Sequence, residues 1–167
     1  MDKLILGFQY TKEEYVRAYR RYLLASKTVT PFSVAALGAL LAGSVIFLAV
    51  SGVNALSVIM AVISAMSAIL LFHLYVLMPP GLFKKTRQFN GPYSITFTDE
   101  IIYFKTVVID STINWDAYME IWEDGEYFYL IQGPRLFSLI PKRVFGGGEE
   151  LDTFLRMAGK RLEIKRL

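Results

Sequence analysis

"FSVAALGALLAGSVIFLAVSGVNALSVIMAVISAMSAILLFHLYVLM", residues 32–78, contains no Asp, Glu, Lys or Arg. The uncharged stretch runs from Thr28 to Phe83, and His73 is its one side chain that titrates near neutral pH. It divides around the turn SGVNA into segments 32–50 and 55–78. A helix of either length rises about 1.5 Å per residue, enough to cross a hydrocarbon layer roughly 30 Å thick. The sequence therefore predicts a hairpin of two transmembrane helices over residues 31–80.

The ends of both segments carry local signals that support this hairpin. Pro31 suits the first turn of a helix, Asn54 suits an N-cap, and Pro79-Pro80 is expected to end the second helix. A cleaved signal peptide is the rival interpretation of the first segment. It would require a charged leader of about thirty residues, and an apolar run continues beyond any cleavage point.

Basic residues flank the uncharged stretch on both sides. Before it lie the bases Lys3, Lys12, Arg17, Arg20, Arg21 and Lys27 and the acids Asp2, Glu13 and Glu14; after it come Lys84, Lys85 and Arg87. The turn at residues 51–55 carries no charge. Because basic residues that flank short spans are retained in the cytoplasm, we expect both termini in the cytoplasm and this turn outside.

Small residues recur along each apolar segment and suggest how the helices pack. They are Ala35, Ala39 and Gly43 in the first segment and, in the second, Ser57, Ala61, Ala65, Ser64 and Ala68. Small side chains let two helix backbones approach closely in lipid. We expect Ala35, Ala39, Gly43, Ala61 and Ala65 to pack the hairpin, and a homodimer seam is the alternative.

The N-terminal segment predicts a short strand followed by a helix. "LILGFQY" has the composition of a strand, and in "TKEEYVRAYRRYLLAS" Thr11 and Glu14 stand at the spacing of a capping box. The helix carries tyrosines on one face and Arg17, Arg20 and Arg21 on another. It either lies in the headgroup zone or packs its aromatic face onto the cytoplasmic domain.

After Arg87 the sequence changes to β-branched and aromatic runs separated by turn residues. The expected strands are YSITFT, EIIYFK, VVIDSTINW, AYMEIWE, EYFYLIQ and RLFSLI, with a seventh from the N-terminus. Asp124-Gly125 and Gly133-Pro134 are expected hairpin turns. "GGGEELDTFLRMAGKRL" predicts one closing amphipathic helix, with Glu149 and Glu150 in its first turn. Periodicity thus predicts a small cytoplasmic α+β domain over residues 84–167.

The order of these parts resembles a known family. A basic, aromatic helix, an uncharged hairpin, a β meander and the run "LIPKRVFGGGEELDTFLRMA" are similar to the YcxB-like family of bacterial membrane proteins, above all at residues 140–145, Leu151 and Phe154. The resemblance implies a multi-pass protein of the bacterial plasma membrane. Its cytoplasmic domain would be an antiparallel split β-barrel of pleckstrin-homology (PH) type, with about seven strands and a closing C-terminal helix. The family brings no catalytic residues to transfer.

The residue inventory restricts chemistry. The chain has no cysteine and one histidine, which excludes disulfides, thiolate metal sites and a histidine-based triad in the cytoplasmic domain. "FGGGEE" places two acids where a bound phosphate would lie, so it predicts a helix start, not a nucleotide site. Residues 84–167 contain equal numbers of acidic and basic side chains, so we expect no nucleic-acid partner. We also expect no cofactor and no metal.

Two basic clusters remain as candidates for binding. They are Lys142-Arg143 and the C-terminal "KRLEIKRL", and Lys84, Lys85 and Arg87 join them if the domain folds back onto the bilayer. Ordinary solvated charge, anionic phospholipid contact and partner docking each explain such clusters. The leading hypothesis is a non-enzymatic, membrane-anchored binding or regulatory protein. The alternatives are a structural subunit of a transporter or other membrane complex, assembled through the small-residue faces, and an enzyme that uses carboxylates.

Overall fold

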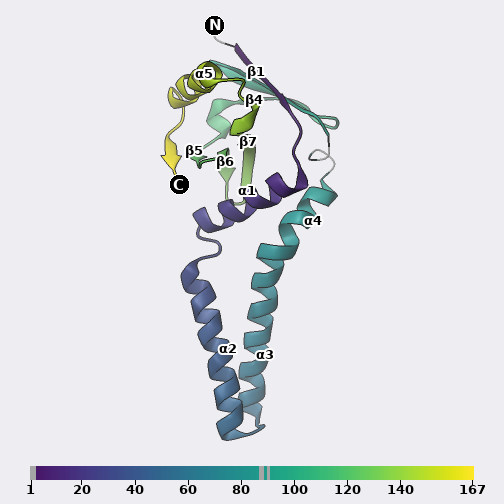
Figure 1. Cartoon of the computed structure of the whole chain (residues 1–167), viewed down its shortest axis with the longest axis vertical. Helices are drawn as coiled ribbons and strands as arrows, with labels where there is room; N and C mark the ends of the chain where they lie inside the picture. The colour runs from purple at the N-terminus through teal and green to yellow at the C-terminus, as the bar shows by residue number, and fades with distance from the viewer. Residues whose placement is uncertain (1–2, 87–88, 90) are drawn as a thin grey trace. The chain divides into compact units, whose positions relative to one another are not determined.

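The computed structural model describes residues 3–86, 89 and 91–167 of the chain. It divides into two compact units, one formed by residues 1–14 and 83–167 and the other by residues 15–82. The first contains the strands and the C-terminal helix, and the second contains the long apolar helices (Figure 1). Each unit is described by itself below.

The second unit is a helical hairpin preceded by most of helix α1 (Lys12–Ala25). Helices α2 (Pro31–Ser51) and α3 (Ala55–Phe72) run side by side in opposite directions (Figure 1). Both begin with a capping box: the side chain of Thr30 accepts from the backbone N–H of Ser33, and that of Asn54 from Ser57. Pro31 lies in the first turn of α2, as expected. The predicted starts of both helices and the predicted end of the first therefore agree with the structure to within a residue.

The prediction that Pro79-Pro80 ends the second long helix is wrong. The helix passes through a π-helical turn, η1 (His73–Leu77), and continues as α4 (Met78–Lys85). A proline needs no N–H partner in the first turn of a helix, and here the wider π turn precedes the two prolines. The whole stretch from Ala55 to Lys85 forms one helical segment of 31 residues.

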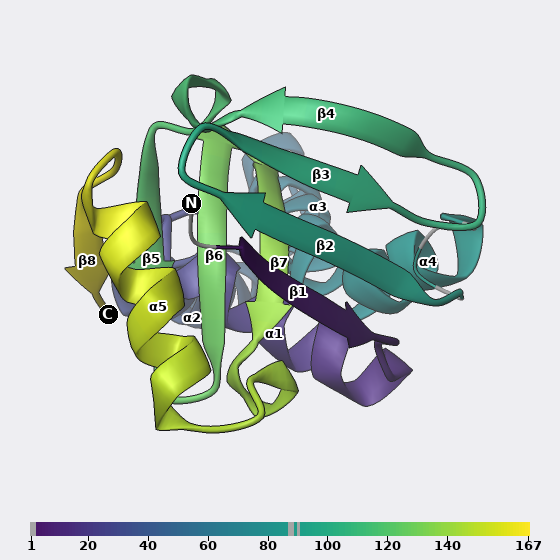
Figure 2. The same cartoon turned by 90° about the horizontal axis from the view of Figure 1, so that it is seen from above.

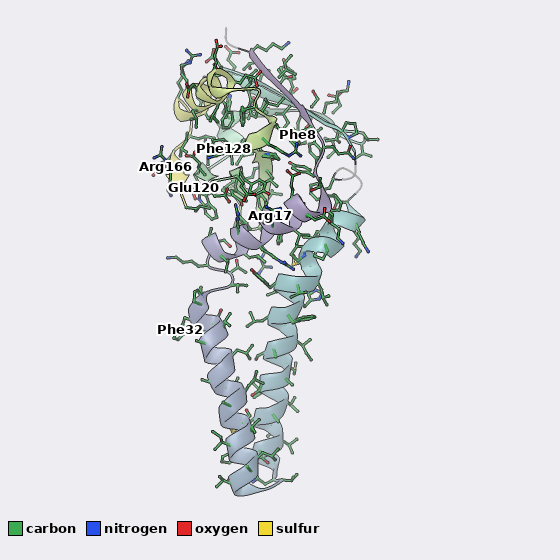
Figure 3. The ribbon with its side chains drawn as sticks, viewed as in Figure 1. Phe8, Arg17, Phe32, Glu120, Phe128 and Arg166 are labelled. Atoms are coloured by element: carbon green, nitrogen blue, oxygen red, sulfur yellow. The ribbon has the colours of Figure 1, made fainter. Side chains whose placement is uncertain are left out.

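Both long helices have the length and composition of membrane spans. The most apolar stretches of the two helices have mean hydropathies of 2.3 and 2.5, and only 6% and 11% of these stretches is buried. The core helix of a soluble protein would be mostly buried. Large apolar side chains instead point outward along the hairpin, and Figure 3 shows Phe32, which is 81% exposed, projecting away from α3.

The first unit contains two four-stranded sheets. One has the order β1-β2-β3-β4, formed by β1 (Lys3–Phe8), β2 (Tyr93–Thr98), β3 (Ile101–Lys105) and β4 (Asp110–Asn114), all antiparallel. The other has the order β7-β6-β5-β8, formed by β5 (Glu120–Glu123), β6 (Tyr127–Gly133), β7 (Leu136–Pro141) and β8 (Ile164–Arg166). Figure 2 shows the strands of one sheet crossing those of the other. The α+β class and the seven predicted strands are confirmed.

The two sheets do not close into one barrel. The chain leaves the first sheet after β4 through a 3₁₀ turn, η3 (Trp115–Ala117), and β4 does not pair with β5. Trp115 is only 1% exposed, and its indole N–H donates to the carbonyl of Thr98 at 2.9 Å. The backbone around this buried side chain forms a 3₁₀ turn, and this turn separates β4 from β5. The strands therefore form two sheets of four strands each.

The C-terminus also differs from the prediction of a single closing helix. Helix α5 (Gly148–Gly159) begins as expected, with Glu149 and Glu150 in its first turn. The chain then adds β8, which pairs in parallel with β5. The buried residues of α5 are Phe154, Met157 and Ala158, and Leu151 and Leu155 are half-buried.

Aromatic side chains form the core between the sheets and α5. The Phe154 ring lies 5.1 Å from the Phe97 ring and 5.0 Å from the Phe128 ring, measured between centroids. Figure 3 places Phe128 inside the domain, among the strands. Such ring pairs contribute about 0.5–1.5 kcal/mol each beyond their buried area. Phe154 of α5 therefore contacts both sheets, through Phe97 of β2 and Phe128 of β6.

Strand β1 joins this core although about 85 residues separate it from β2. Leu4, Leu6 and Phe8 point inward in an alternating pattern, and the Phe8 ring stacks on Tyr93 at 5.5 Å. The hydroxyl of Tyr10 donates to the carbonyl of Leu139 and so links this end of the first sheet to the second. The expectation that the N-terminal strand joins the sheet is confirmed.

This pairing predicts a large effect of a substitution near the N-terminus. Leu6 is 1% exposed, so Leu6→Ala is expected to lower the free energy of unfolding of the β unit by about 2–5 kcal/mol. Ile5→Ala is the matched control, because Ile5 is 58% exposed on the same strand. Thermal unfolding of the full chain in mild detergent, followed by near-ultraviolet circular dichroism, measures both. Equal losses for the two variants would contradict the register described here.

Candidate functional site

The basic residues predicted as a contact surface are divided by the structure into paired and unpaired groups. Lys142 and Arg143 lie in the 3₁₀ turn η4 (Lys142–Val144), directly after β7. The ammonium group of Lys142 lies 2.8 Å from Oε1 of Glu123 and 4.9 Å from the centre of the Phe128 ring. Its charge is therefore satisfied inside the domain by a carboxylate and an aromatic face.

Arg143 holds the N-terminal segment against η4. Its Nε lies 2.5 Å from Oε1 of Glu14, its Nη2 lies 2.8 Å from Oε2, and Nη2 also donates to the carbonyl of Gln9 at 2.9 Å. The hydrogen bond with Glu14 raises the pKa of Arg143 above its ordinary value. Glu14 also accepts from the backbone N–H of Thr11 at 3.1 Å, which confirms the predicted capping box. One carboxylate thus caps α1 and binds Arg143 in a bidentate pair.

The C-terminal cluster is paired in the same way. Lys165 binds Glu120, Arg166 lies 3.5 Å from Glu123, and Lys160 lies 2.9 Å from Asp99. The hydrogen bond from Lys165 lowers the pKa of Glu120. Figure 3 shows Glu120 and Arg166 on the same flank of the domain. The first two pairs join β8 to β5, and the third joins the residue after α5 to the turn between β2 and β3. The cations of the cluster "KRLEIKRL" named here are therefore paired with carboxylates of the β unit.

Lys84 and Lys85 have a different environment. They form the last turn of α4, both are exposed, and no carboxylate of the described residues lies within ion-pair distance of either. Arg87, predicted with them, lies outside the described residues. Phe83, one residue earlier, is buried and stacks on Phe89 at 6.5 Å. The two lysines therefore stand in solvent at the end of the helical segment.

On α1 the three arginines differ from one another. Arg17 is exposed, while Arg20 and Arg21 are half-buried. The Nε of Arg20 donates to the carbonyl of Tyr75 at 3.0 Å, and its guanidinium lies 5.2 Å from the centre of the Tyr75 ring. Figure 3 labels Arg17 on this helix. The predicted aromatic stripe is also present, because the Tyr19 ring lies within 6.2 Å of the rings of Tyr15 and Tyr22.

The contact between α2 and α3 includes two serines. The hydroxyls of Ser44 and Ser64 lie 2.6 Å apart, and each lies 2.8 Å from a carbonyl of its own helix, Ser44 from that of Leu40 and Ser64 from that of Met60. One hydroxyl can donate to its own carbonyl while the other donates across the pair. Both side chains are buried. An interhelical hydrogen bond in an apolar environment stabilises a helix pair by about 0.6 kcal/mol on average.

The small residues predicted to pack the hairpin lie mostly outside this contact. Ala35, Ala39, Ala61 and Ala65 are exposed and Gly43 is half-buried. No atom lies within 4 Å of where a Cβ on Gly43 would stand. Ala61 and Ala65 line an open groove of about 130 Å³ whose floor includes Ser44 and Ser64. The sequence signal for the contact was the serine itself, because a hydroxyl in an apolar helix needs a partner.

The described residues contain no group of three or more His, Cys, Asp or Glu side chains that could hold a metal ion. A hollow of about 570 Å³ is lined by Gly148, Glu149, Asp152, Thr153 and Arg156. All five belong to α5, so this hollow is the open flank of one helix.

Comparison with known proteins agrees with part of this description. Residues 97–158 match the YcxB-like protein family. The matched segment begins in β2 and ends in α5, so it includes β3 to β7, the η4 pair Lys142-Arg143 and the core residue Phe154, but neither β1 nor β8. The family predicted from the sequence is confirmed over these residues. No curated protein and no solved structure matches the chain.

The Arg143–Glu14 pair predicts coupled effects on stability. Arg143→Lys and Glu14→Gln each remove the bidentate pair, so each is expected to destabilise the β unit and the double variant to cost little more than either one. The expected coupling energy is about 1 kcal/mol, because the pair is partly exposed. Urea unfolding of the four proteins gives this value. Additive losses would show that Arg143 does not bind Glu14 in solution.

Proposed function

We propose that this chain is a non-enzymatic, membrane-anchored binding or regulatory protein. Its apolar hairpin crosses the bacterial plasma membrane twice, and its β domain is held at the inner leaflet, where it contacts anionic phospholipid or a membrane partner. The observation that carries this proposal is the exposure of the hairpin. Only 6% and 11% of the most apolar stretch of each helix is buried, and exposed apolar side chains of this kind are stable in lipid.

Charge supports the proposed sidedness. Unpaired Lys84 and Lys85 stand at the end of the second helical segment, and Arg17, Arg20, Arg21 and Lys27 precede the first. The turn between α2 and α3 has no charge. The positive-inside rule then puts both termini in the cytoplasm. We further propose that the two crossed sheets with α5 are a PH-like split barrel that is open between β4 and β5.

The sidedness predicts which positions an impermeant thiol reagent reaches. The chain has no cysteine, so single cysteines report cleanly. Ser51→Cys, in the turn region, is expected to react in intact cells, and Thr112→Cys, exposed on β4, only after the cells are permeabilised. The measurement is the labelled fraction on a gel. Labelling of Thr112→Cys in intact cells would reverse the proposed topology.

Anionic lipid is the partner that the unpaired lysines favour, since a basic residue near an anionic surface contributes about 1 kcal/mol. The full chain, extracted in mild detergent, is expected to retain phosphatidylglycerol over phosphatidylethanolamine. Lys84→Gln with Lys85→Gln is expected to lower that enrichment several-fold. Lys12→Gln with Lys105→Gln makes the same change of charge outside the hairpin sequence and is expected to leave it near the wild-type value. Lipid analysis of the purified proteins measures the ratio.

The proposal fails if two results coincide. One is a wild-type chain that shows no anionic enrichment. The other is a photoreactive residue at position 85 that captures no membrane protein in intact cells.

The exposed alanines support a second candidate, a structural subunit of a transporter or other membrane complex. Ala39, Ala61 and Ala65 are exposed on the hairpin, where a partner helix could approach closely. Replacement of Ala39, Gly43, Ala61 and Ala65 by leucine is expected to abolish assembly while the β unit stays folded. Size determination in detergent, alongside near-ultraviolet circular dichroism, checks both. An unchanged assembly size would remove this candidate.

A further inference from the structure

The second helical segment contains a carbonyl that no backbone donor can serve. In an α-helix the carbonyl of Tyr75 would accept from residue 79, and in a π turn from residue 80. Both are prolines and have no N–H. The backbone N–H of Met78 is already given to His73. Local sequence therefore leaves the Tyr75 carbonyl unpaired in an apolar region, which would cost several kcal/mol.

Arg20 supplies the missing donor from 55 residues away. Its Nε donates to the Tyr75 carbonyl at 3.0 Å, and its guanidinium plane lies over the ring of the same residue at 5.2 Å. Nε and the ring together fix the position of the guanidinium. The edge formed by Nη1 and Nη2 keeps its N–H donors, and no described residue pairs with them. That edge has the spacing that binds two oxygens of a phosphate or a carboxylate.

No carboxylate of the described residues forms an ion pair with Arg20. The carbonyl and the ring are both neutral, and Arg20 is half-buried. By contrast, Lys142, Arg143 and Lys165 each lie against a carboxylate. A half-buried cation without a counter-charge favours an external anion. Tyr75 lies one turn before Met78, where the second predicted span ends, and tyrosine is typical of the headgroup level of a bilayer.

We propose that Arg20, fixed on the π turn by the Tyr75 carbonyl, is a binding site for the phosphate group of an anionic phospholipid. The inference rests on the proposed membrane anchoring and deepens it, because it assigns one specific headgroup contact. Pro79 and Pro80 have a defined part in this site. They expose the carbonyl that positions the arginine, so the site depends on residues that carry no charge.

The test uses the full chain in a zwitterionic detergent, with phosphatidylglycerol as the probe and native mass spectrometry to count bound lipid. Arg20→Gln is expected to lower phosphatidylglycerol affinity about tenfold or more. Arg17→Gln is the matched control, with the same loss of charge one turn earlier on α1, and is expected to change the affinity less than threefold. Inorganic phosphate as a competitor distinguishes a free anion site from a lipid site. Displacement of the lipid by millimolar phosphate would assign the site to the free ion and overturn the lipid proposal.

Pro79→Ala tests the positioning without a change of charge. It returns an N–H that can serve the Tyr75 carbonyl, releases Arg20 and is expected to weaken phosphatidylglycerol binding about threefold or more. Because it adds a backbone hydrogen bond, loss of binding in this variant cannot be assigned to unfolding. Equal losses in Arg20→Gln and Arg17→Gln, or unchanged binding in Pro79→Ala, would overturn the site. Lipid enrichment that depends on Lys84 and Lys85 would still stand in that case, so the proposed function would survive.

Discussion

A polar group that leaves water must find its hydrogen-bond partner inside the protein, and this requirement arranges both units of the chain. In the hairpin, the hydroxyls of Ser44 and Ser64 lie 2.6 Å apart, and each lies 2.8 Å from a carbonyl of its own helix. At the π turn, Arg20 donates to the carbonyl of Tyr75, which neither Pro79 nor Pro80 can serve. In the β unit, the indole of Trp115 reaches the carbonyl of Thr98 and breaks the sheet as it does so. In each case the partner decides the local geometry.

Charge follows the same logic with a different outcome in each unit. The acids Glu14, Glu120 and Glu123 lie next to cations that hold η4, β8 and the N-terminal segment in place. These cations form their ion pairs within the β unit. Lys84, Lys85 and Arg20 have no such acid among the described residues, and all three lie at or near the end of the second apolar segment. Free positive charge is thus concentrated where a bilayer surface would be.

The sequence predicted the elements that carry strong local signals. Alternation marked the seven strands, capping residues marked α1, α2 and α3, and the uncharged stretch marked the hairpin. The sequence missed what depends on residues far apart. Strand β8 reads as a charged tail, because Lys165 and Arg166 hide its pairing with β5. The helix past Pro79-Pro80 could not be inferred from the prolines alone, because its stabilising donor belongs to α1.

Site residues were harder to predict, because charge in a sequence does not show whether it is compensated. Lys142 and Arg143 were equal in sequence to Lys84 and Lys85 as candidates for lipid contact, yet only the first pair lies against carboxylates. Similarly, alanine and serine are both small, and only the hydroxyl of Ser44 needed burial against a partner. The useful signal is therefore an imbalance: a polar or charged group whose neighbours along the chain cannot satisfy it. Pro79 and Pro80 create such an imbalance at Tyr75, because neither has an N–H for its carbonyl. Arg20 donates that hydrogen bond, and its own positive charge remains available to bind an anion.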